Sequence, residues 1–145
     1  MSAIDKIVFD PNDQVVYRPT SARQTKELKV QNSGDRVVML KMKSTRPGTF
    51  KMRPVYFLLQ PKELKIVKLV FKGLPRGTAP SLRDRFSIVI AHAPSSSQDA
   101  QKMWKNHKYQ KKLATDGGLG RKNIRIRFEG FAAPASASES DKKKK

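Results

Sequence analysis

The sequence predicts an all-β fold, a sandwich of antiparallel strands, from three observations. Apolar and polar residues alternate over short segments, as they do in strands that bury one face. Clusters of Gly, Pro, Asn, Asp and Ser interrupt these segments about every ten residues, as in sandwiches. The strand-like segments also follow one another with no helix between most of them. At 145 residues, the chain is long enough for one domain with its own core.

Two short strands come first, at residues 4–9 and 14–17. Asp10 and Pro11 end the first strand, because Pro has no N–H for a strand ladder and the polar residues after it favour a turn. Pro19 stops the second. A polar linker then leads into residues 28–53, the segment around which we expect the rest of the domain to be organised.

Residues 28–53 are predicted to form three strands. A tight turn at residues 33–35 (Ser-Gly-Asp) joins the first two, and residues 46–48 (Arg-Pro-Gly) precede the third. The two faces of the middle strand differ, with Val38, Leu40 and Met42 on one and Val37, Met39, Lys41 and Lys43 on the other. This segment therefore buries one side and presents a largely cationic side to water.

The remaining strands are predicted at residues 55–59, 64–71, 85–91 and 123–128, with a Gly- and Pro-rich loop at 72–84. Residues 98–114 have helical spacing, with an apolar face only in the first half, so one short helix near 98–112 is expected, with a capping box at Ser95 and Gln98. About seven strands of this kind fit an immunoglobulin-like sandwich. Residues 1–130 form the predicted domain, and residues 131–145, an Ala/Ser tail ending in lysines, are expected to be disordered.

Composition favours a binding protein inside the cell. The formal net charge is +19 at pH 7, and 27 of the 31 basic but also 10 of the 12 acidic residues lie in residues 1–130, so the excess belongs to the domain. The absence of Cys removes disulfides, thiolate metal sites and Cys nucleophiles, and no export signal or membrane span is visible. We therefore expect a cytoplasmic protein whose contact with membranes is at most peripheral, through Lys142 to Lys145.

Catalysis and cofactor binding find no support in the sequence. His92 and His107 are the only histidines, and the carboxylates are scattered singly, so no catalytic pair or metal cluster is visible. Gly117, Gly118 and Gly120 lack P-loop spacing and precede a strand instead of a helix. We predict that the chain is not an enzyme and has no cofactor.

A cationic strip is the main candidate for partner binding. Alternation places Lys41, Lys43, Lys51 and Arg53 on exposed strand faces. These residues serve either to keep the protein soluble and its sheet edges unpaired, or to receive an acidic extended peptide or the acidic face of another domain. The sequence leaves both interpretations open, together with the possibility of a homodimer. Nucleic-acid binding is a further alternative, because cations lie near Trp104 and Tyr109, although no nucleic-acid-binding motif is present.

Five short motifs, in order along the chain, resemble the major sperm protein (MSP) domain. They are KVQN at 29–32, KMKST at 41–45, LQPKE at 59–63, MWK at 103–105 and GRKNIRIRFE at 120–129. The resemblance covers residues 4–130 and implies a seven-stranded immunoglobulin-like sandwich.

Two functions follow from the resemblance. Major sperm proteins polymerise without nucleotide into the filaments that move nematode sperm, and small MSP-domain accessory proteins regulate those filaments. VAMP-associated proteins use the domain at the endoplasmic reticulum to bind acidic peptides with two phenylalanines, through a Lys-Thr-Thr run and a later Lys and Met. Here the run is Lys43-Ser44-Thr45, and Arg85 and Ser87 stand at the later positions.

The resemblance favours an accessory protein of the sperm filament system, in the cytoplasm of the pseudopod. Its partners would be MSP filaments or acidic protein segments, and a VAMP-associated-protein-like adaptor is the alternative. The expected partner-binding residues are Lys41, Lys43, Ser44, Thr45, Lys51, Arg53 and Arg85.

Overall fold

The computed structural model describes residues 3–94, 99–106 and 119–131. A short 3-10 helix, η1 (Ala3–Lys6), precedes the strands, and one α-helix, α1 (Ala100–Trp104), lies between the last two of them. The strands are β1 (Ile7–Asp10), β2 (Gln14–Tyr17), β3 (Gln24–Asn32), β4 (Val38–Ser44), β5 (Phe50–Arg53), β6 (Tyr56–Leu59), β7 (Leu64–Phe71), β8 (Arg85–His92) and β9 (Gly120–Phe128).

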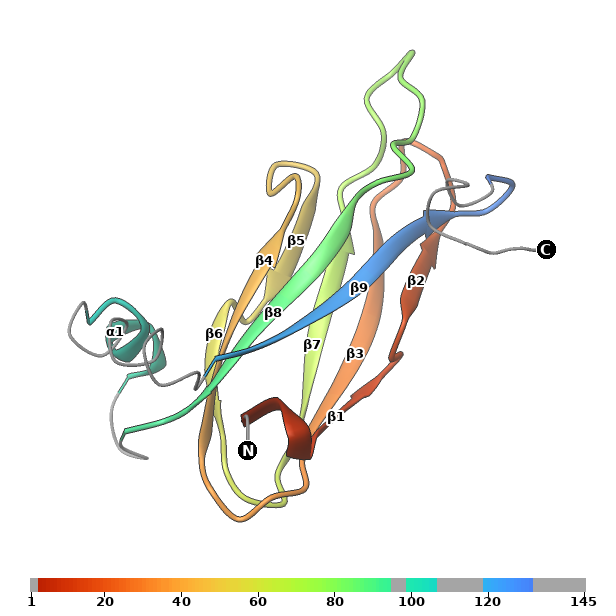
Figure 1. Ribbon diagram of the computed structural model, residues 1–145. Helices are drawn as coiled ribbons and strands as arrows, with labels where there is room; N and C mark the ends of the chain where they lie inside the picture. The colour runs from red at the N-terminus through yellow and green to blue at the C-terminus, as the bar shows by residue number, and fades with distance from the viewer. Residues whose placement is uncertain (1–2, 95–98, 107–118, 132–145) are drawn as a thin grey trace.

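The strands form two layers, which confirms the predicted immunoglobulin-like sandwich (Figure 1). Sheet A has the order β1-β3-β7-β5, and sheet B has the order β2-β9-β8-β4-β6. The chain changes sheet twice within an edge strand, between β1 and β2 at Pro11 and between β5 and β6 at Pro54, so the nine segments make seven strands. One pairing, β2 with β9, is parallel, and the remaining pairings are antiparallel.

The predicted hairpin at residues 33–35 is wrong, because β3 lies in sheet A and β4 in sheet B. The turn crosses from one layer to the other and is held by Asn32, which is only 1% exposed. Its Nδ2 donates to the carbonyl oxygens of Arg36 (2.7 Å) and Leu59 (3.1 Å), and its Oδ1 accepts from the Gly34 N–H (3.0 Å). Local turn signals do not reveal whether two strands pair or face each other across a core. Both arrangements bury the same alternating side chains.

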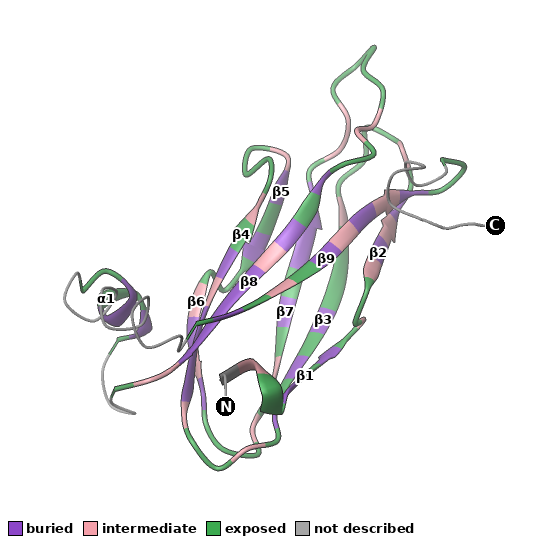
Figure 2. Ribbon diagram, viewed as in Figure 1, coloured by how far each residue is buried: buried purple, intermediate pink, exposed green. Residues whose placement is uncertain are grey.

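Alternating side chains from both sheets fill the interior, as the banding of buried and exposed residues along the strands shows (Figure 2). Tyr17, Phe50, Phe71 and Phe128 form an aromatic cluster, with the Phe50 and Phe71 rings stacked 5.4 Å apart. The Tyr17 hydroxyl donates to the Leu69 carbonyl (2.7 Å), which satisfies a polar group that burial would otherwise leave without a partner. Burial also raises the pKa of Tyr17 above its usual value.

Helix α1 covers one end of the outer face of sheet B. Met103 and Trp104 pack against Met39, Val89 and Ala91, and all five side chains are buried. The prediction that Met39 points to water is therefore wrong, since the helix covers it. Within the predicted segment 98–114, the helix begins after Asp99, whose carboxylate accepts from the N–H groups of residues 101 and 102. Ser95, Gln98 and His107 lie outside the described residues, as does the predicted tail beyond Phe131.

Candidate functional site

Sheet B carries a cluster of cations on its outer side, beyond the end that α1 covers. Strand register places Lys41 and Arg121 on either side of Val89, and it places Arg85 beside Arg125. The outward side of a β-strand repeats every second residue, so Lys43 and Arg127 share this side. We call this surface the cationic face, and it consists of Lys41, Lys43, Arg85, Arg121, Arg125 and Arg127 with Ser87 and Asn123 between them.

Positive charge on the cationic face is largely uncompensated. No outward-pointing position of β2, β4, β6, β8 or β9 holds an acidic residue. Asp13, beside the end of β2, accepts from Arg125 at 2.9 Å, and it is 69% exposed. Two unit charges of the same sign about 5 Å apart on a protein surface repel each other, so this clustering costs stability unless a partner neutralises it.

Two cations on the face have neutral neighbours. The Lys41 Nζ lies 6.0 Å from the centroid of the Tyr56 ring, and the Arg127 Nη1 donates to the Gln14 Oε1 (3.1 Å). Neither neighbour removes the charge. In the centre of the face, the Ser87 hydroxyl donates to the Asn123 Oδ1 (2.7 Å). The middle of the face is therefore polar.

Asp84 is buried next to the end of the cationic face where Arg85 lies, and it holds the residues at this border in place. It is 6% exposed, and it accepts from the Thr45 hydroxyl (2.7 Å) and from the Nε (2.9 Å) and Nη2 (2.6 Å) of Arg46. The Thr45 Oγ1 in turn accepts from the Arg85 N–H (3.2 Å). The Thr45 hydroxyl is thus engaged within the protein, and it positions the backbone of Arg85.

The predicted cationic strip is divided between the two sheets. Lys41 and Lys43 point outward from β4 in sheet B, whereas Lys51 and Arg53 point outward from β5 in sheet A. The prediction that these four cations share one strand surface is therefore wrong, because alternation assigns a residue to a face of its strand but not to a sheet. The two pairs approach each other only at the side of the sandwich, where Lys43, Lys51 and Arg53 line a groove of about 580 Å³.

Among the other predicted site residues, Arg85 is exposed on the cationic face, and Ser44 turns into the side groove. Its hydroxyl donates to the Phe50 carbonyl (2.9 Å). Sequence reasoning missed Arg121, Asn123, Arg125 and Arg127 on β9, and it missed the role of Asp84. The alternation of apolar and polar residues along 120–128 is the sequence pattern that could have identified the outward side chains of β9. No sequence signal identifies β9 as the neighbour of β8.

His92 is the histidine that the structure describes, since His107 lies outside the described residues. His92 lies at the end of β8, half-buried, and burial, with the nearby Arg36, lowers the pKa of its imidazole. Within residues 3–94, 99–106 and 119–131, no group of three or more His, Asp or Glu side chains is arranged to hold a metal ion. No helix in the same ranges has the length and apolar character needed to cross a membrane.

The two sheets define an immunoglobulin-like β-sandwich domain, and comparison with known proteins gives its family. The model of the MSP (Major sperm protein) domain matches residues 6–112. The chain belongs to this family, as the motifs predicted.

Curated relatives include two VAMP-associated proteins. The chain is 30% identical over 95 residues to vesicle-associated membrane protein-associated protein SCS22 of Saccharomyces cerevisiae, which covers 63% of this chain and 54% of that protein. It is 26% identical over 103 residues to vesicle-associated membrane protein-associated protein A of Rattus norvegicus, covering 70% of this chain and 41% of that protein. The chain thus matches about half the length of these relatives.

Solved structures with the same fold include two MSP-domain proteins of Caenorhabditis elegans. WR4, an MSP family member, aligns with a TM-score of 0.63 and 18% identity, covering 85% of this chain and 97% of that one. SSP-19, an MSP-domain protein like family member, aligns with a TM-score of 0.60 and 22% identity, covering 82% and 97%. At these identities the likeness extends to the fold.

Proposed function

We propose that this chain is a non-enzymatic protein-binding module that docks its cationic face on acidic protein surfaces. We further propose that its partners belong to the MSP filament system of nematode sperm, in the cytoplasm of the pseudopod, where it modulates filament assembly. The observation that carries the proposal is the face itself, with six cations and no acidic residue at the outward positions of its strands.

The spacing and rigidity of the cations support docking on this face. The cations come from three neighbouring strands of a paired sheet, so their positions are set by the ladder instead of by loops. A partner with carboxylates at similar spacing would relieve the repulsion and gain from complementary charge, which also speeds encounter. Membership of the MSP domain family supports a binding role over a catalytic one.

Cosedimentation with MSP filaments tests the proposal. The wild-type chain is expected to pellet with the filaments and to change their growth rate. Arg85→Glu combined with Arg121→Glu reverses two cations on the face and should remove most of the binding. Arg23→Glu with Lys29→Glu is the matched control, because it makes the same change in total charge away from the face. Absence of pelleting, or equal loss in both variants, would contradict the proposal.

A VAMP-associated-protein-like adaptor is the second candidate, and the placement of Lys43 and Arg85 on one face favours it. The resemblance implies that an acidic peptide with two phenylalanines would bind there. At the position of the family's methionine, however, Ser87 forms a hydrogen bond with Asn123, so an apolar contact for a phenylalanine is missing at this point. An NMR titration with such a peptide discriminates, because the adaptor function requires shifts at Lys43 and Arg85 with micromolar affinity or better.

The nucleic-acid alternative loses support from the position of Trp104. This side chain is 4% exposed and packs between α1 and sheet B, so it offers no ring on which a base could stack. Tyr109 lies outside the described residues. Fluorescence anisotropy with duplex DNA across a salt series is the appropriate check, and tight binding that falls steeply with salt would favour this alternative.

A further inference from the structure

One side of the sandwich is open between β4 and β5. Strand β6 pairs with β4 from Val38 to Lys41, and the Met42 N–H donates to the Val55 carbonyl (2.8 Å), so Lys43 and Ser44 have no described strand on that side. Strand β5 is the outermost strand of sheet A, and it pairs only with β7. Two strand edges from different sheets therefore border the groove of about 580 Å³ described above.

Backbone groups of both edges are directed into this groove. Lys72 donates its N–H to the Thr49 carbonyl, so Thr49 and Lys51 turn their backbone groups toward β7. Since strand residues alternate, Met52 between Lys51 and Arg53 turns its N–H and C=O the other way, into the groove. By the same argument, the bond from the Thr45 N–H to the Arg85 carbonyl leaves the Ser44 backbone groups on the groove side of β4. On the same side of β5, the Phe50 N–H donates to the Arg46 carbonyl (2.9 Å) and the Phe50 carbonyl accepts from the Ser44 hydroxyl (2.9 Å). Met52 is therefore the residue of β5 whose backbone groups offer a template for another strand.

The groove has an apolar floor and a cationic rim. Met42, Phe50 and Met52 form the floor, and each is less than 7% exposed. Val55 adds an apolar wall and is 43% exposed. Lys43, Lys51 and Arg53 stand on the rim, exposed, and none of them makes an ion pair with another described residue.

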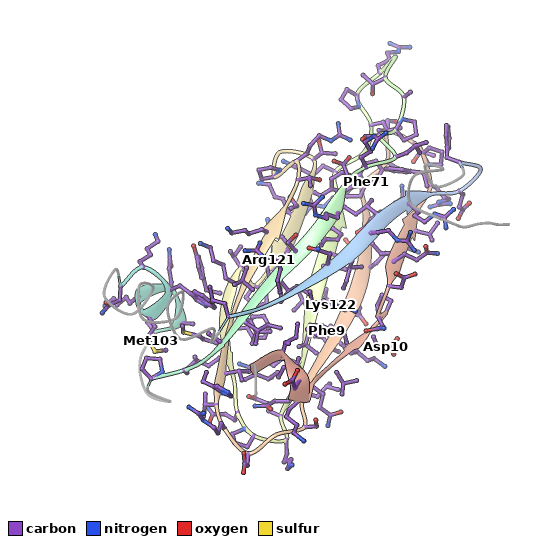
Figure 3. The ribbon with its side chains drawn as sticks, in the orientation of Figure 1. Phe9, Asp10, Phe71, Met103, Arg121 and Lys122 are labelled. Carbon is purple, nitrogen blue, oxygen red and sulfur yellow. The ribbon has the colours of Figure 1, made fainter. Side chains whose placement is uncertain are left out.

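The opposite side of the sandwich is closed. There the chain also changes sheet, from β1 to β2, but Lys122 points inward from β9 and places its Nζ 5.8 Å from the centroid of the Phe9 ring (Figure 3). Helix η1 contacts β8 and β9 at the same end of the molecule. Among the residues that the structure describes, the side between β4 and β5 is thus more open than the side between β1 and β2.

We propose that this groove binds an extended segment of a partner protein that adds to β5 as a further strand, with acidic residues alternating with apolar ones. Side chains opposite each other on paired strands lie about 5 Å apart, so every second residue of the segment would face Lys51 or Arg53. Carboxylates at those positions match the rim. The residues between them would point to Met42, Met52 and Val55, where apolar side chains fit.

Charge argues against a second copy of this chain as the occupant. Pairing of β5 with β5 of another copy would place Lys51 and Arg53 opposite the same residues, and like charges directly opposite destabilise a strand pair. An acidic partner removes this cost. The proposed site shares Lys43 with the cationic face but is otherwise distinct from it, and the proposal does not depend on the function proposed above.

The test uses a synthetic peptide, acetyl-Glu-Val-Glu-Val-Glu-Val-Glu-amide, added to the full-length chain. We expect chemical-shift changes in the amides of Lys51, Met52 and Arg53 and of Lys43 and Val55, with slowed hydrogen exchange at Met52. A peptide of the same composition with its glutamates and valines in two blocks should bind at least about tenfold more weakly. Methylation of the peptide amides that would face β5 should abolish binding, whereas methylation of the alternate amides should not.

Two variants separate this site from the cationic face. Lys51→Glu with Arg53→Glu is expected to weaken the alternating peptide at least about tenfold, and Arg23→Glu with Lys29→Glu to leave it nearly unchanged. Arg85→Glu with Arg121→Glu, which disrupts the cationic face, should also leave this peptide bound. Val55→Asp provides a second change in the groove, because it places an acid beside the apolar floor without altering β5.

The proposal is overturned if the peptide causes no shift along β5, if both peptide arrangements bind equally, or if methylation at either set of amides has the same effect. It is also overturned if the cationic-face variant alone removes binding, since the peptide would then occupy the cationic face. Self-association that disappears in the Lys51 and Arg53 variant would show that a second copy occupies the groove, and it would equally overturn the proposal.

Discussion

The outer faces of the two sheets differ in how their charges are arranged. On sheet A, Glu27 pairs with Lys68, and this hydrogen bond and charge hold the pKa of Glu27 below its usual value. Asp10 and Lys29 lie opposite each other in register. On sheet B the charged residues at the outward strand positions are all cations. The two faces belong to the same strongly basic chain, so the segregation of charge, more than its total, marks the candidate site.

Apolar residues differ between the faces in the same way. Val8, Leu64 and Ile66 on sheet A are 54%, 48% and 43% exposed, whereas Met39, Val89 and Ala91 on sheet B are buried beneath α1. The outer face of sheet B is thus buried under α1 at one end, and at the other end it exposes the cationic face to solvent.

Trp104→Ala should lower the free energy of unfolding by about 3 kcal/mol, because it removes a buried aromatic side chain and opens a cavity over sheet B. Ile66→Ala on sheet A is the comparison and should cost less than about 1 kcal/mol, since that side chain is already 43% exposed. Urea denaturation measures both. Similar losses would mean that α1 does not cover its end of sheet B as described.

Asp84→Ala should lower the free energy of unfolding by about 2 kcal/mol, because a buried carboxylate that accepts from Thr45 and Arg46 is removed. Asp13→Ala, which breaks an exposed ion pair, should cost less than about 1 kcal/mol. Thermal unfolding monitors stability, and NMR shifts at Arg85 report whether the border of the face has moved. An unmoved Arg85 amide would show that Thr45 and Asp84 do not position it.

Alternation and turn signals predicted most of the strands, the two-layer fold and the inward side chains, because the residues from Leu64 to Phe71 and from Arg85 to Ala91 carry these patterns locally. The same signals failed where the answer depends on distant segments. Residues 33–35 predict a turn in either topology, and only the Asn32 bonds to Arg36 and Leu59 show that the turn crosses between sheets.

Only part of the candidate site could be predicted, because local patterns show which side chains are exposed but not which strands lie side by side. Alternation assigned Lys41 and Lys43 to exposed strand positions, and the family resemblance gave Arg85; the structure places all three on one face. Lys51 and Arg53 were grouped with them because they are close in sequence, yet β5 belongs to the other sheet. The arginines of β9 were missed because only strand order brings them beside β8, and that order follows from packing across about 35 residues of chain.

Arg85→Glu should raise the free energy of unfolding by about 0.5 kcal/mol, since Arg85 lies opposite Arg125 in register and the reversal turns repulsion into attraction. Binding to the partner should fall in the same variant. Lys68→Glu on sheet A should instead lower stability, because it places like charges together at Glu27. Chemical denaturation compares the two. A loss of stability in Arg85→Glu would contradict the claim that the cationic face is strained by its own charge.

His92 at the end of β8 should produce the smallest effect, on pH dependence. Its folded-state pKa is lowered by burial and then by Arg36, below the unfolded value of about 6.5. The stability that neutral His92 contributes is therefore present above that unfolded value and is lost as pH falls through the folded pKa. His92→Gln should flatten this part of the stability profile. An NMR titration showing a raised pKa would reverse the sign and contradict the prediction.

The most direct test of the central claim is an NMR shift map of the protein with an acidic partner, either the MSP protein in unpolymerised form or an acidic segment taken from it. The account predicts that the largest changes fall on Lys41, Lys43, Arg85 and Arg121 of sheet B and diminish as salt is added. Changes centred on Lys29, Ile66 and Lys68 of sheet A would contradict it.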